Sequence, residues 1–356
     1  MPAAPVEVLV LGAGIGGCAL AYHLTRRSVG PVTVYDPRTP AAGATGRAAG
    51  VITEQLWDRW DVEVTRESHR EYARLCQRWE PSAYLANGFV RWTANPAALP
   101  VLEQARTRLR NWGVDVEEAD ASDLARWVPE GRFDDVVAAI YSPHDACVTP
   151  SSLTTIYAES ARQGGAVFDF GREFGGLRRD DGRWTVVAGG ERLAARSVVV
   201  VAGAWSKRVL EESGHPLPLA PYRTQAALLA PPAPRTEPFP TLHDLDSDVY
   251  VRPEGPGRLL AGDGTERVEA DPDRFVLGGD ASFLEHLALR LAERLPGWKE
   301  ASVAASWAGV CTATPDRRPL VGAVTDAPGL YVMTGFNGFG VMRAGGVARR
   351  LADLIA

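Results

Sequence analysis

The sequence predicts an α/β fold in two parts: a Rossmann-type domain assembled from discontinuous segments, and a second, α+β domain built on an antiparallel sheet. Three observations support this prediction. The chain opens with a strand, a glycine-rich turn and a helix. A continuous apolar strand over 196–203 is of the kind buried in a parallel sheet. Short alternating strands separated by proline and glycine clusters occupy 221–265.

The opening stretch is typical of a dinucleotide-binding turn. Residues 6–11 have strand character, and Gly12, Gly14 and Gly17 follow in G-x-G-x-x-G spacing before apolar residues at helical spacing. The first glycine permits a tight turn, the second lets a pyrophosphate approach the backbone, and the third lets the helix lie close to the sheet. The N–H groups at the helix start then face the phosphates.

A second strand over 31–36 ends in an acidic residue, Asp36, nineteen positions beyond Gly17. An acid at this distance is placed to bind a ribose 2′-hydroxyl, which favours FAD or NAD over NADP. The alternative is a glycine-rich turn in an ordinary α/β protein, and the complete strand–turn–helix–strand–acid pattern argues against it.

The composition narrows the class of function. The chain has 356 residues, of which 46% are hydrophobic and 23% charged, as expected for an ordinary globular protein of two connected domains. Its net charge of −6, without a basic run interleaved with aromatics, predicts no nucleic-acid partner. We expect no membrane partner, because no apolar span is long enough for a membrane helix and the short opening run lacks the basic leader of a signal peptide.

Cysteine and histidine usage predicts neither a disulfide framework nor a metal site. The four cysteines are scattered without a C-x-x-C pair, and the six histidines are equally dispersed. We therefore expect no metal and take the cytoplasm as the compartment.

The remaining elements follow from periodicity and turn signals. We expect helices over 57–79, 97–112, 122–127, 151–164, 283–295 and 339–355, and further strands over 88–92, 166–170, 183–187 and 330–333.

Six pieces of the chain carry a resemblance to a known family. They are the G-x-G-x-x-G turn, the small-residue loop 42–52, Val-Ala-Gly-Ala-Trp at 201–205, Tyr-Val-Arg-Pro at 250–253 with Leu-Ala-Gly at 260–262, Trp-Ala-Gly-Val-Cys-Thr-Ala-Thr-Pro-Asp at 307–316 with Pro-Leu-Val-Gly at 319–322, and Gly-Phe-Asn-Gly-Phe-Gly-Val-Met at 335–342. In this order they resemble the D-amino-acid oxidase, glycine oxidase and sarcosine oxidase superfamily of FAD-dependent flavoproteins. The resemblance covers almost the whole chain.

The resemblance implies FAD as the cofactor and a division into two domains. The FAD-binding domain is expected at 1–80, 145–220 and 305–356, and the substrate-binding domain at 81–144 and 221–304. The candidate cofactor-binding residues lie in the matching turns and loops: Gly12, Gly14, Ile15, Gly16, Gly17, Asp36, Pro37, Arg38, Thr45, Gly46, Arg47, Ala48, Ala49, Gly50, Phe174, Ala202, Gly203, Trp205, Gly309, Gly335, Asn337, Gly338, Phe339, Gly340, Val341 and Met342.

Physical reasons support three of these pieces independently. Small residues after the apolar strand, at Ala202 and Gly203, allow a cofactor to approach closely. The loop 45–50 is small enough to pass under a flavin. Backbone N–H groups at the helix start near 335–340 can stabilise the negative charge that grows on a flavin upon reduction.

The family's chemistry implies oxidation of a C–N bond. A hydride leaves the carbon beside nitrogen for the flavin, and the resulting imine hydrolyses to an oxo product and an amine. The implied partners are a small-molecule amine or amino-acid substrate and molecular oxygen or another electron acceptor; with oxygen the by-product is hydrogen peroxide.

The substrate site departs from the family pattern. Where glycine and D-amino-acid oxidases have an arginine that grips the substrate carboxylate, this chain has Cys311, which cannot make a bidentate pair. Five residues are candidates to replace that arginine or to take part in catalysis: Tyr222, Tyr250, Arg252, Arg91 and Arg343. Alternatively, Arg343 is a solvated first-turn residue, and Tyr250 and Arg252 form a half-buried pair on one sheet face.

Further departures bear on how the flavin is held and reoxidised. Arg47 occupies the place of a histidine in dimethylglycine dehydrogenases, and Cys311 is not in the register of the cysteine that links FAD in sarcosine oxidases, so we expect non-covalent FAD. Phe339 replaces a histidine of the sarcosine oxidase group, and the lysine that assists oxygen reduction near Leu260 is missing, so the acceptor stays open between oxidase and dehydrogenase.

Three alternatives remain at the level of sequence. The same scaffold can oxidise a C–O bond of a hydroxy acid or polyol, or serve as a flavoprotein subunit of an electron-transfer complex; an NAD-dependent reductase would carry no flavin.

Trp57 and Trp60 follow the small-residue loop 42–52 and have two interpretations. They either line a pocket for a cationic or aromatic substrate or pack within a helix.

Overall fold

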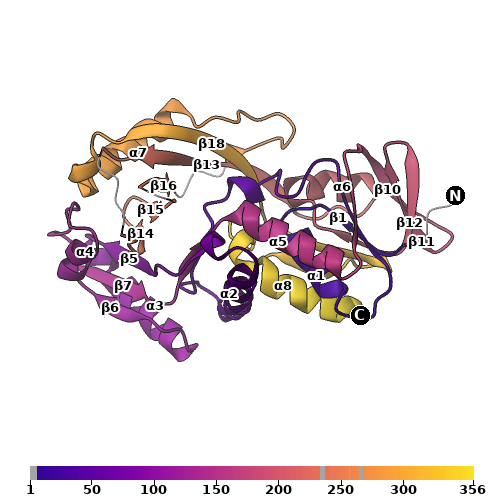
Figure 1. The fold of residues 1–356 in the computed structure, drawn as a ribbon, viewed down its shortest axis with the longest axis horizontal. Helices are drawn as coiled ribbons and strands as arrows, with labels where there is room; N and C mark the ends of the chain where they lie inside the picture. Colours follow the sequence, from indigo (N-terminus) through magenta and orange to yellow (C-terminus); the bar gives the residue numbers. More distant parts are fainter. Residues whose placement is uncertain (1–5, 233–236, 256, 264–267) are drawn as a thin grey trace.

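Two large sheets organise the molecule (Figure 1). The computed structural model describes residues 6–232, 237–255, 257–263 and 268–356. In Figure 1 the eight-stranded sheet lies on the right, on the side of both termini, and the nine-stranded sheet lies on the left. A small three-stranded sheet consists of β3 (Val51–Ile52), β8 (Ala146–Val148) and β4 (Tyr84–Leu85).

The eight-stranded sheet has a parallel centre of five strands in the order β9-β2-β1-β12-β20. Because these strands come from the beginning, middle and end of the chain, the expected discontinuous assembly is confirmed. The β10–β11 hairpin and β19 extend the sheet in antiparallel fashion. The strands are β1 (Val6–Leu11), β2 (Val32–Asp36), β9 (Val167–Phe170), β10 (Phe174–Asp180), β11 (Arg183–Ala188), β12 (Glu191–Val200), β19 (Leu320–Ala323) and β20 (Leu330–Thr334).

Helices cover both faces of this sheet. Alternation along β1 sends Val8 and Val10 into one core with long helices, and Leu9 and Leu11 into another core with a short helix. The first core is built with α1 (Ile15–Leu24), α5 (Pro150–Gln163) and α8 (Gly340–Ile355), together with α2 (Arg59–Trp79) that crosses α8. The second contains α6 (Ser206–Glu212).

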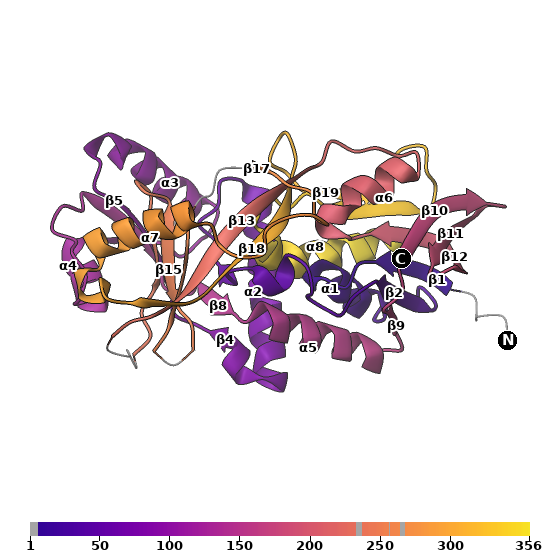
Figure 2. The ribbon, with the colours of Figure 1, turned by 90° about the horizontal axis from the view of Figure 1, so that it is seen from above.

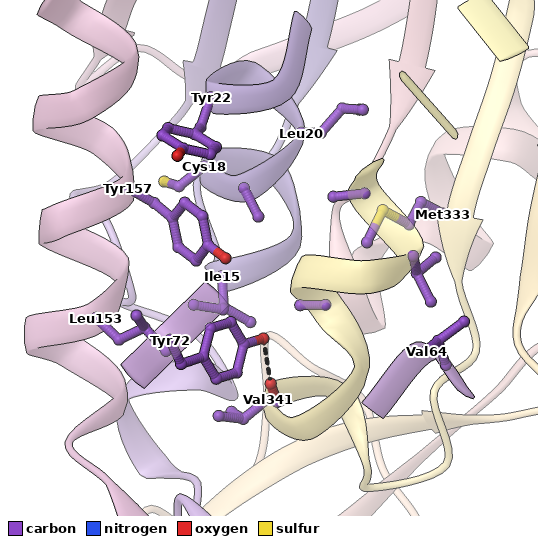
Figure 3. Packing of buried hydrophobic residues seen from close by; sticks show 14 of the residues in the cluster. Ile15, Cys18, Leu20, Tyr22, Val64, Tyr72, Leu153, Tyr157, Met333 and Val341 are labelled. Atoms are coloured by element: carbon purple, nitrogen blue, oxygen red, sulfur yellow. Dashed lines mark hydrogen bonds between the residues drawn. The ribbon is translucent and has the colours of Figure 1, made fainter. Parts of the chain in front are cut away.

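The start of α8 is fixed by a buried tyrosine of α2 (Figure 3). The Tyr72 hydroxyl donates to the carbonyl of Val341 at 2.7 Å and accepts from the N–H of Gly345 at 3.0 Å. Tyr157 of α5 packs edge-on against the Tyr72 ring, with ring centroids 6.0 Å apart. Helices α2 and α5 therefore hold the first turn of α8 at a set position relative to the sheet.

The nine-stranded sheet is antiparallel except for one parallel pairing, between β5 and β14. Its strands are β5 (Phe89–Thr93), β6 (Glu117–Ala119), β7 (Ala138–Ser142), β13 (Ala220–Ala230), β14 (Thr241–Asp244), β15 (Val249–Pro253), β16 (Leu259–Gly262), β17 (Val268–Glu269) and β18 (Ser302–Ala313). Its associated helices are α3 (Leu99–Asn111), α4 (Ala121–Trp127) and α7 (Ala281–Arg294).

The longest strand of the second sheet was not expected from the sequence. β18 pairs with β13 from Ala313 opposite Ala220 to Ser302 opposite Ala230, and the two strands run together toward the eight-stranded sheet (Figure 2). The expected boundary at 304/305 falls inside β18, because the backbone pairing continues across the motif at 307–316. The residue limits of the two domains remain a prediction.

Candidate functional site

A cavity of about 750 Å³ lies at the carboxyl ends of the parallel strands. The ends of β1, β2, β12 and β20 contribute Leu11, Asp36, Val201 and Thr334 to its lining, and β18 contributes Cys311 from the other sheet. Open α/β sheets bind their ligands at the carboxyl ends of the strands, and the volume of this cavity falls within the range of known ligand pockets.

The glycine turn has the geometry that its spacing predicts. Gly12 has φ of +116°, and a Cβ there would lie 2.5 Å from the carbonyl oxygen of Val201. A Cβ on Gly17 would lie 1.8 Å from the carbonyl oxygen of Gly12, so only glycine lets α1 lie this close to the turn. Gly14 and Ile15, at the start of α1, line the cavity. The N–H of Ile15 donates to the Thr45 hydroxyl at 3.2 Å, and the start of α1 faces the cavity with the positive end of its dipole, as an anion site requires.

Asp36 ends β2 beside this turn. Its carboxylate accepts from the N–H of Ala13 and from the N–H of Arg38, each at 2.8 Å, and Asp36 lines the cavity. A carboxylate held in this way keeps lone pairs for further donors. The arrangement suits a ribose hydroxyl and disfavours a 2′-phosphate, whose charge it would repel.

The small-residue loop is tied down from within and from β18. The Arg47 guanidinium donates to the carbonyls of Ala42 at 2.6 Å and Gly43 at 2.9 Å, and the indole N–H of Trp307 donates to the carbonyl of Arg47 at 2.9 Å. Burial, with a smaller contribution from Arg38, lowers the pKa of Arg47. Arg47 therefore lines the cavity while its charge is used chiefly to shape its own loop.

The loop before α8 is pinned by Asn337. This residue has a left-handed φ of 55°, and its side-chain amide donates to the carbonyl of Gly335 at 2.6 Å and to the hydroxyl of Thr314 at 3.1 Å. Its backbone N–H donates to the carbonyl of Thr312 at 2.9 Å. The loop is thereby fixed to the end of β18, and Gly340 at the start of α8 lines the cavity. A second helix N-terminus therefore meets the cavity.

Most of the expected cofactor residues converge on this one cavity, and the others belong to the same segments of the chain without lining it. The lining includes Gly12, Gly14, Ile15, Gly16, Asp36, Pro37, Arg38, Thr45, Arg47, Ala48, Phe174, Ala202, Gly203, Trp205, Gly335, Asn337, Gly338, Gly340 and Val341. The remainder are Gly17, Gly46, Ala49, Gly50, Gly309, Phe339 and Met342. Sequence reasoning missed Arg208, Pro272, Asp273, Phe275 and Leu277, which also line the cavity and carry no motif.

Three of the substrate candidates lie on one face of the nine-stranded sheet. The candidate Arg91 lies opposite His243, and His243 lies opposite the candidate Tyr250. Arg91, His243 and Tyr250 therefore form a row across β5, β14 and β15. Arg252, two residues beyond Tyr250, shares this face. Neither these residues nor Tyr222 belongs to the lining of the cavity.

The two arginines of this face are engaged by the protein itself. Arg252 is buried, donates to the carbonyl of Ala49 at 2.5 Å and pairs with Glu254 at 2.5 Å. Arg91 donates to His243 Nδ1 at 3.1 Å and to the carbonyl of Gln55 at 3.2 Å. Burial lowers the pKa of Arg91 to about 10. Both arginines thus tie the nine-stranded sheet to residues 49–55, which include the end of the small-residue loop.

Arg343 is not the solvated residue that the sequence left open as an alternative, since it is 1% exposed. Its Nη1 lies 3.1 Å from Asp61 Oδ1, and its guanidinium lies 5.0 Å from the centroid of the Phe339 ring. Burial lowers the pKa of Arg343. Arg343 thus pairs with α2 and does not line the cavity, while its Nε and Nη1 make no hydrogen bond. Its expected role as carboxylate ligand stays a prediction.

Cys311 contributes a neutral group to the cavity. Burial raises the pKa of its thiol to about 11, against a smaller opposing effect of the hydrogen bond with Tyr222. The four cysteines all have free thiols. Within the described parts of the chain, no group of three or more His, Cys, Asp or Glu side chains is arranged to hold a metal ion, and none of the helices has the length and apolarity to cross a membrane.

Known proteins are similar in sequence to this chain over almost its whole length. Dimethylglycine dehydrogenase of Mus musculus is 27% identical over 98% of this chain, which spans 42% of that protein. Glycine oxidase of Geobacillus kaustophilus is 24% identical over 98% of this chain and 92% of its own length. The chain thus spans about two fifths of the mitochondrial relative.

Solved structures share the fold. L-proline dehydrogenase from P. horikoshii superposes with a TM-score of 0.92 at 24% identity, covering 99% of this chain and 93% of its own. Glycine oxidase from Geobacillus kaustophilus gives a TM-score of 0.86 at 23% identity, covering 98% and 94%.

The family described as FAD dependent oxidoreductase matches residues 7–354. This confirms the resemblance predicted from the six sequence pieces. The cavity fits the cofactor of that family, since the Gly12 turn, two helix N-termini and Asp36 meet there. The chain therefore belongs to the FAD dependent oxidoreductase family and is an enzyme with FAD as its cofactor.

Proposed function

We propose that this enzyme oxidises the bond between nitrogen and the adjacent CH group of an amino acid or an N-substituted amino acid. The observation that carries the proposal is the cavity at the strand ends, where the turns of the dinucleotide motif and the start of α8 meet β18 of the other sheet. Support comes from relatives that act on dimethylglycine, sarcosine and glycine by their names.

Bound FAD supplies a two-electron acceptor for the hydride that leaves the substrate carbon. The protein's part is positioning and electrostatics. N–H groups in the first turn of α8 stabilise negative charge at the cavity, and Asn337 holds the loop that leads into them. The neutral thiol of Cys311 adds no charge that would repel a substrate.

For the substrate, we place the carboxylate near the sheet face that carries Tyr222 and Tyr250, because Arg343 is committed to Asp61. The hydroxyl of Tyr222 lies 3.0 Å from the position of a Cβ on Gly338, in the loop before α8 that lines the cavity. Burial raises the pKa of Tyr250, which keeps its hydroxyl a neutral donor. A hydroxyl donates a neutral hydrogen bond to a carboxylate, whereas an arginine also supplies a positive charge.

The proposed products are an imine, which water converts to an oxo compound and an amine, and reduced cofactor that oxygen or another acceptor reoxidises. We further propose that FAD is held without a covalent bond, since Arg47 is engaged with Ala42 and Gly43 and the Cys311 thiol is protonated.

The test is anaerobic bleaching of the yellow holoprotein. The panel contains sarcosine, dimethylglycine, glycine, iminodiacetate and proline, with lactate and glycerol 3-phosphate as hydroxy comparators. We expect bleaching by at least one amine and by neither comparator. Bleaching by a hydroxy compound alone would move the reaction to a C–O bond. Stable yellow colour with every compound would favour a flavoprotein subunit. Peroxide formation compared with dye reduction then identifies the acceptor.

A further inference from the structure

A segment of the second sheet's half crosses to the cofactor cavity. Residues 271–277, here called the strap, follow β17 and precede α7, and Pro272, Asp273, Phe275 and Leu277 line the cavity. β17 itself lies near the middle of the molecule beside β13 (Figure 2). The strap therefore brings side chains from the nine-stranded half against a site formed mainly by the other half.

The strap presents apolar groups to the cavity. Phe275 and Leu277 line it while Val276 between them does not, as expected for an extended segment whose successive side chains alternate. Leu277 is nevertheless 58% exposed. An exposed leucine that borders a cavity gains burial when a ligand fills that cavity. The strap is thus poised to cover a bound ligand.

One end of the strap is firmly attached to its own sheet. Arg223 of β13 donates to the carbonyl of Val276 at 3.2 Å and to the carbonyl of Gly278 at 2.6 Å, and it pairs with Asp280. The N–H of Ala308 in β18 donates to the carbonyl of Leu277 at 2.7 Å. These contacts fix the end of the strap that leads into α7.

The other end follows Ala270, whose N–H donates to the carbonyl of Pro221 in β13 at 3.1 Å, and it is tied to the eight-stranded half by one acidic side chain. Asp273 accepts from the indole N–H of Trp205 at 2.7 Å and pairs with Arg208 of α6. Arg38 stacks on the Trp205 ring at 4.6 Å from its centroid, close to Asp36 and the expected ribose site. The contacts of Asp273, here called the latch, therefore connect the strap to the nucleotide end of the cavity.

The latch is weak compared with the two ends that are attached to β13. The Asp273 and Arg208 side chains are 44% and 53% exposed, and exposed ion pairs contribute little and are screened by salt. Both ends of the strap are attached to β13, whereas the Asp273–Arg208 contact with the eight-stranded half is exposed and salt-sensitive. The residues between the two ends can therefore move away from the cavity without disturbing either sheet.

We propose that the strap closes over bound FAD and that the Asp273 latch controls how fast FAD enters and leaves. The proposal requires the FAD site described above and is independent of the substrate. It adds a binding element from the nine-stranded half, with Asp273 as a positioning residue that acts through Trp205 and Arg208.

The experiment measures release of FAD from holoprotein after dilution, followed by the rise of free-flavin fluorescence. Asp273→Asn keeps the side-chain shape and removes its charge. We expect release to become about threefold to tenfold faster, in line with the loss of a charge-assisted hydrogen bond at an exposed site. Raising the salt concentration should speed release from the wild type and leave the variant nearly unchanged.

The matched control is Asp326→Asn, which removes the same charge from an exposed turn. Its release rate should equal that of the wild type. Arg208→Gln should also speed release, and the double variant with Asp273→Asn should be no faster than the faster single variant, because both remove one interaction.

An unchanged release rate and unchanged salt response in both Asp273→Asn and Arg208→Gln would overturn the proposal. So would additive effects in the double variant. These outcomes leave the proposed amine oxidation untouched, since bleaching by substrate is measured on holoprotein before any cofactor is lost.

Discussion

The half of this enzyme that forms most of the cofactor cavity and the nine-stranded half differ in what holds their candidate functional groups. In the first of these, backbone N–H groups and glycines of short turns face the cavity, as at Gly12 and Gly14. In the nine-stranded half, the expected substrate ligands are side chains, and Arg91 and Arg252 are engaged by the protein's own carbonyls. Backbone sites are encoded locally, whereas side-chain sites depend on which strands become neighbours.

The largest expected effect belongs to the half that forms most of the cofactor cavity. Gly17→Ala places a Cβ 1.8 Å from the backbone oxygen of Gly12, which cannot move away without opening the turn. We expect purified protein without bound flavin. Gly278→Ala is the control, because its Cβ would meet nothing within 4 Å and Gly278 does not line the cavity. A fully yellow Gly17→Ala protein, judged by the absorbance ratio of flavin to protein, would contradict this view of the turn.

The second prediction concerns the buried ion pair. Arg343 and Asp61 form this pair. The variant Arg343→Met leaves the Asp61 charge buried without its partner, so the free energy of unfolding should fall by about 3–5 kcal/mol. The double variant with Asp61→Asn should recover part of this loss in urea unfolding. Arg349→Met, on the same helix with a more exposed pair to Glu67, is the control. Wild-type stability of Arg343→Met together with a raised KM would return Arg343 to the substrate site.

The third prediction tests the ribose contact. Asp36→Ala removes the acceptor of two backbone N–H groups and of the expected ribose hydroxyl. Hydrogen bonds to charged groups are worth about 1.5–3 kcal/mol, so we expect the Kd for FAD to rise about tenfold to a hundredfold in a fluorescence titration. Asp180→Ala, on the exposed end of β10, should leave the Kd unchanged. An unaltered Kd in Asp36→Ala would remove Asp36 from the site.

The fourth prediction concerns the nine-stranded half. Tyr250→Phe deletes one hydroxyl on the proposed substrate face, so KM for an amino-acid substrate should rise about threefold to tenfold, as for one neutral hydrogen bond. The Kd for FAD should not change. Tyr331→Phe in β20 is the control. Equal KM values for Tyr250→Phe and wild type would place the carboxylate elsewhere.

The smallest effect is expected at Cys311. Because its thiol pKa is raised to about 11, it should resist alkylation at pH 8 in the folded protein and become reactive only as the pH approaches 11 or on unfolding. Cys311→Ser should keep FAD, and acid precipitation of either protein should leave the flavin in the supernatant. Flavin retained in the wild-type pellet but not in the Cys311→Ser pellet would reveal a covalent link at this residue.

The sequence alone determined the parts that depend on short-range chemistry. The spacing of Gly12, Gly14 and Gly17 predicts a strand, a turn and a helix, because glycine alone fits the φ of +116° with the crowding at Gly12 and the close approach at Gly17. Asp36 and the loop before α8 follow from similar local signals, and both line the cavity. Buried apolar strands from distant segments indicated the discontinuous sheet.

Only the tertiary structure decided which side chains are free to act. The pairing of Arg343 with Asp61 depends on how α8 crosses α2, and the ties of Arg252 to Ala49 depend on the register of β15 against distant strands. The strap over the cavity lies about 235 residues from Asp36 in the sequence and carries no motif. Such contacts are set by long-range packing, which no short pattern in the chain records, so the sequence identified the cofactor and left its cover and its substrate ligands open.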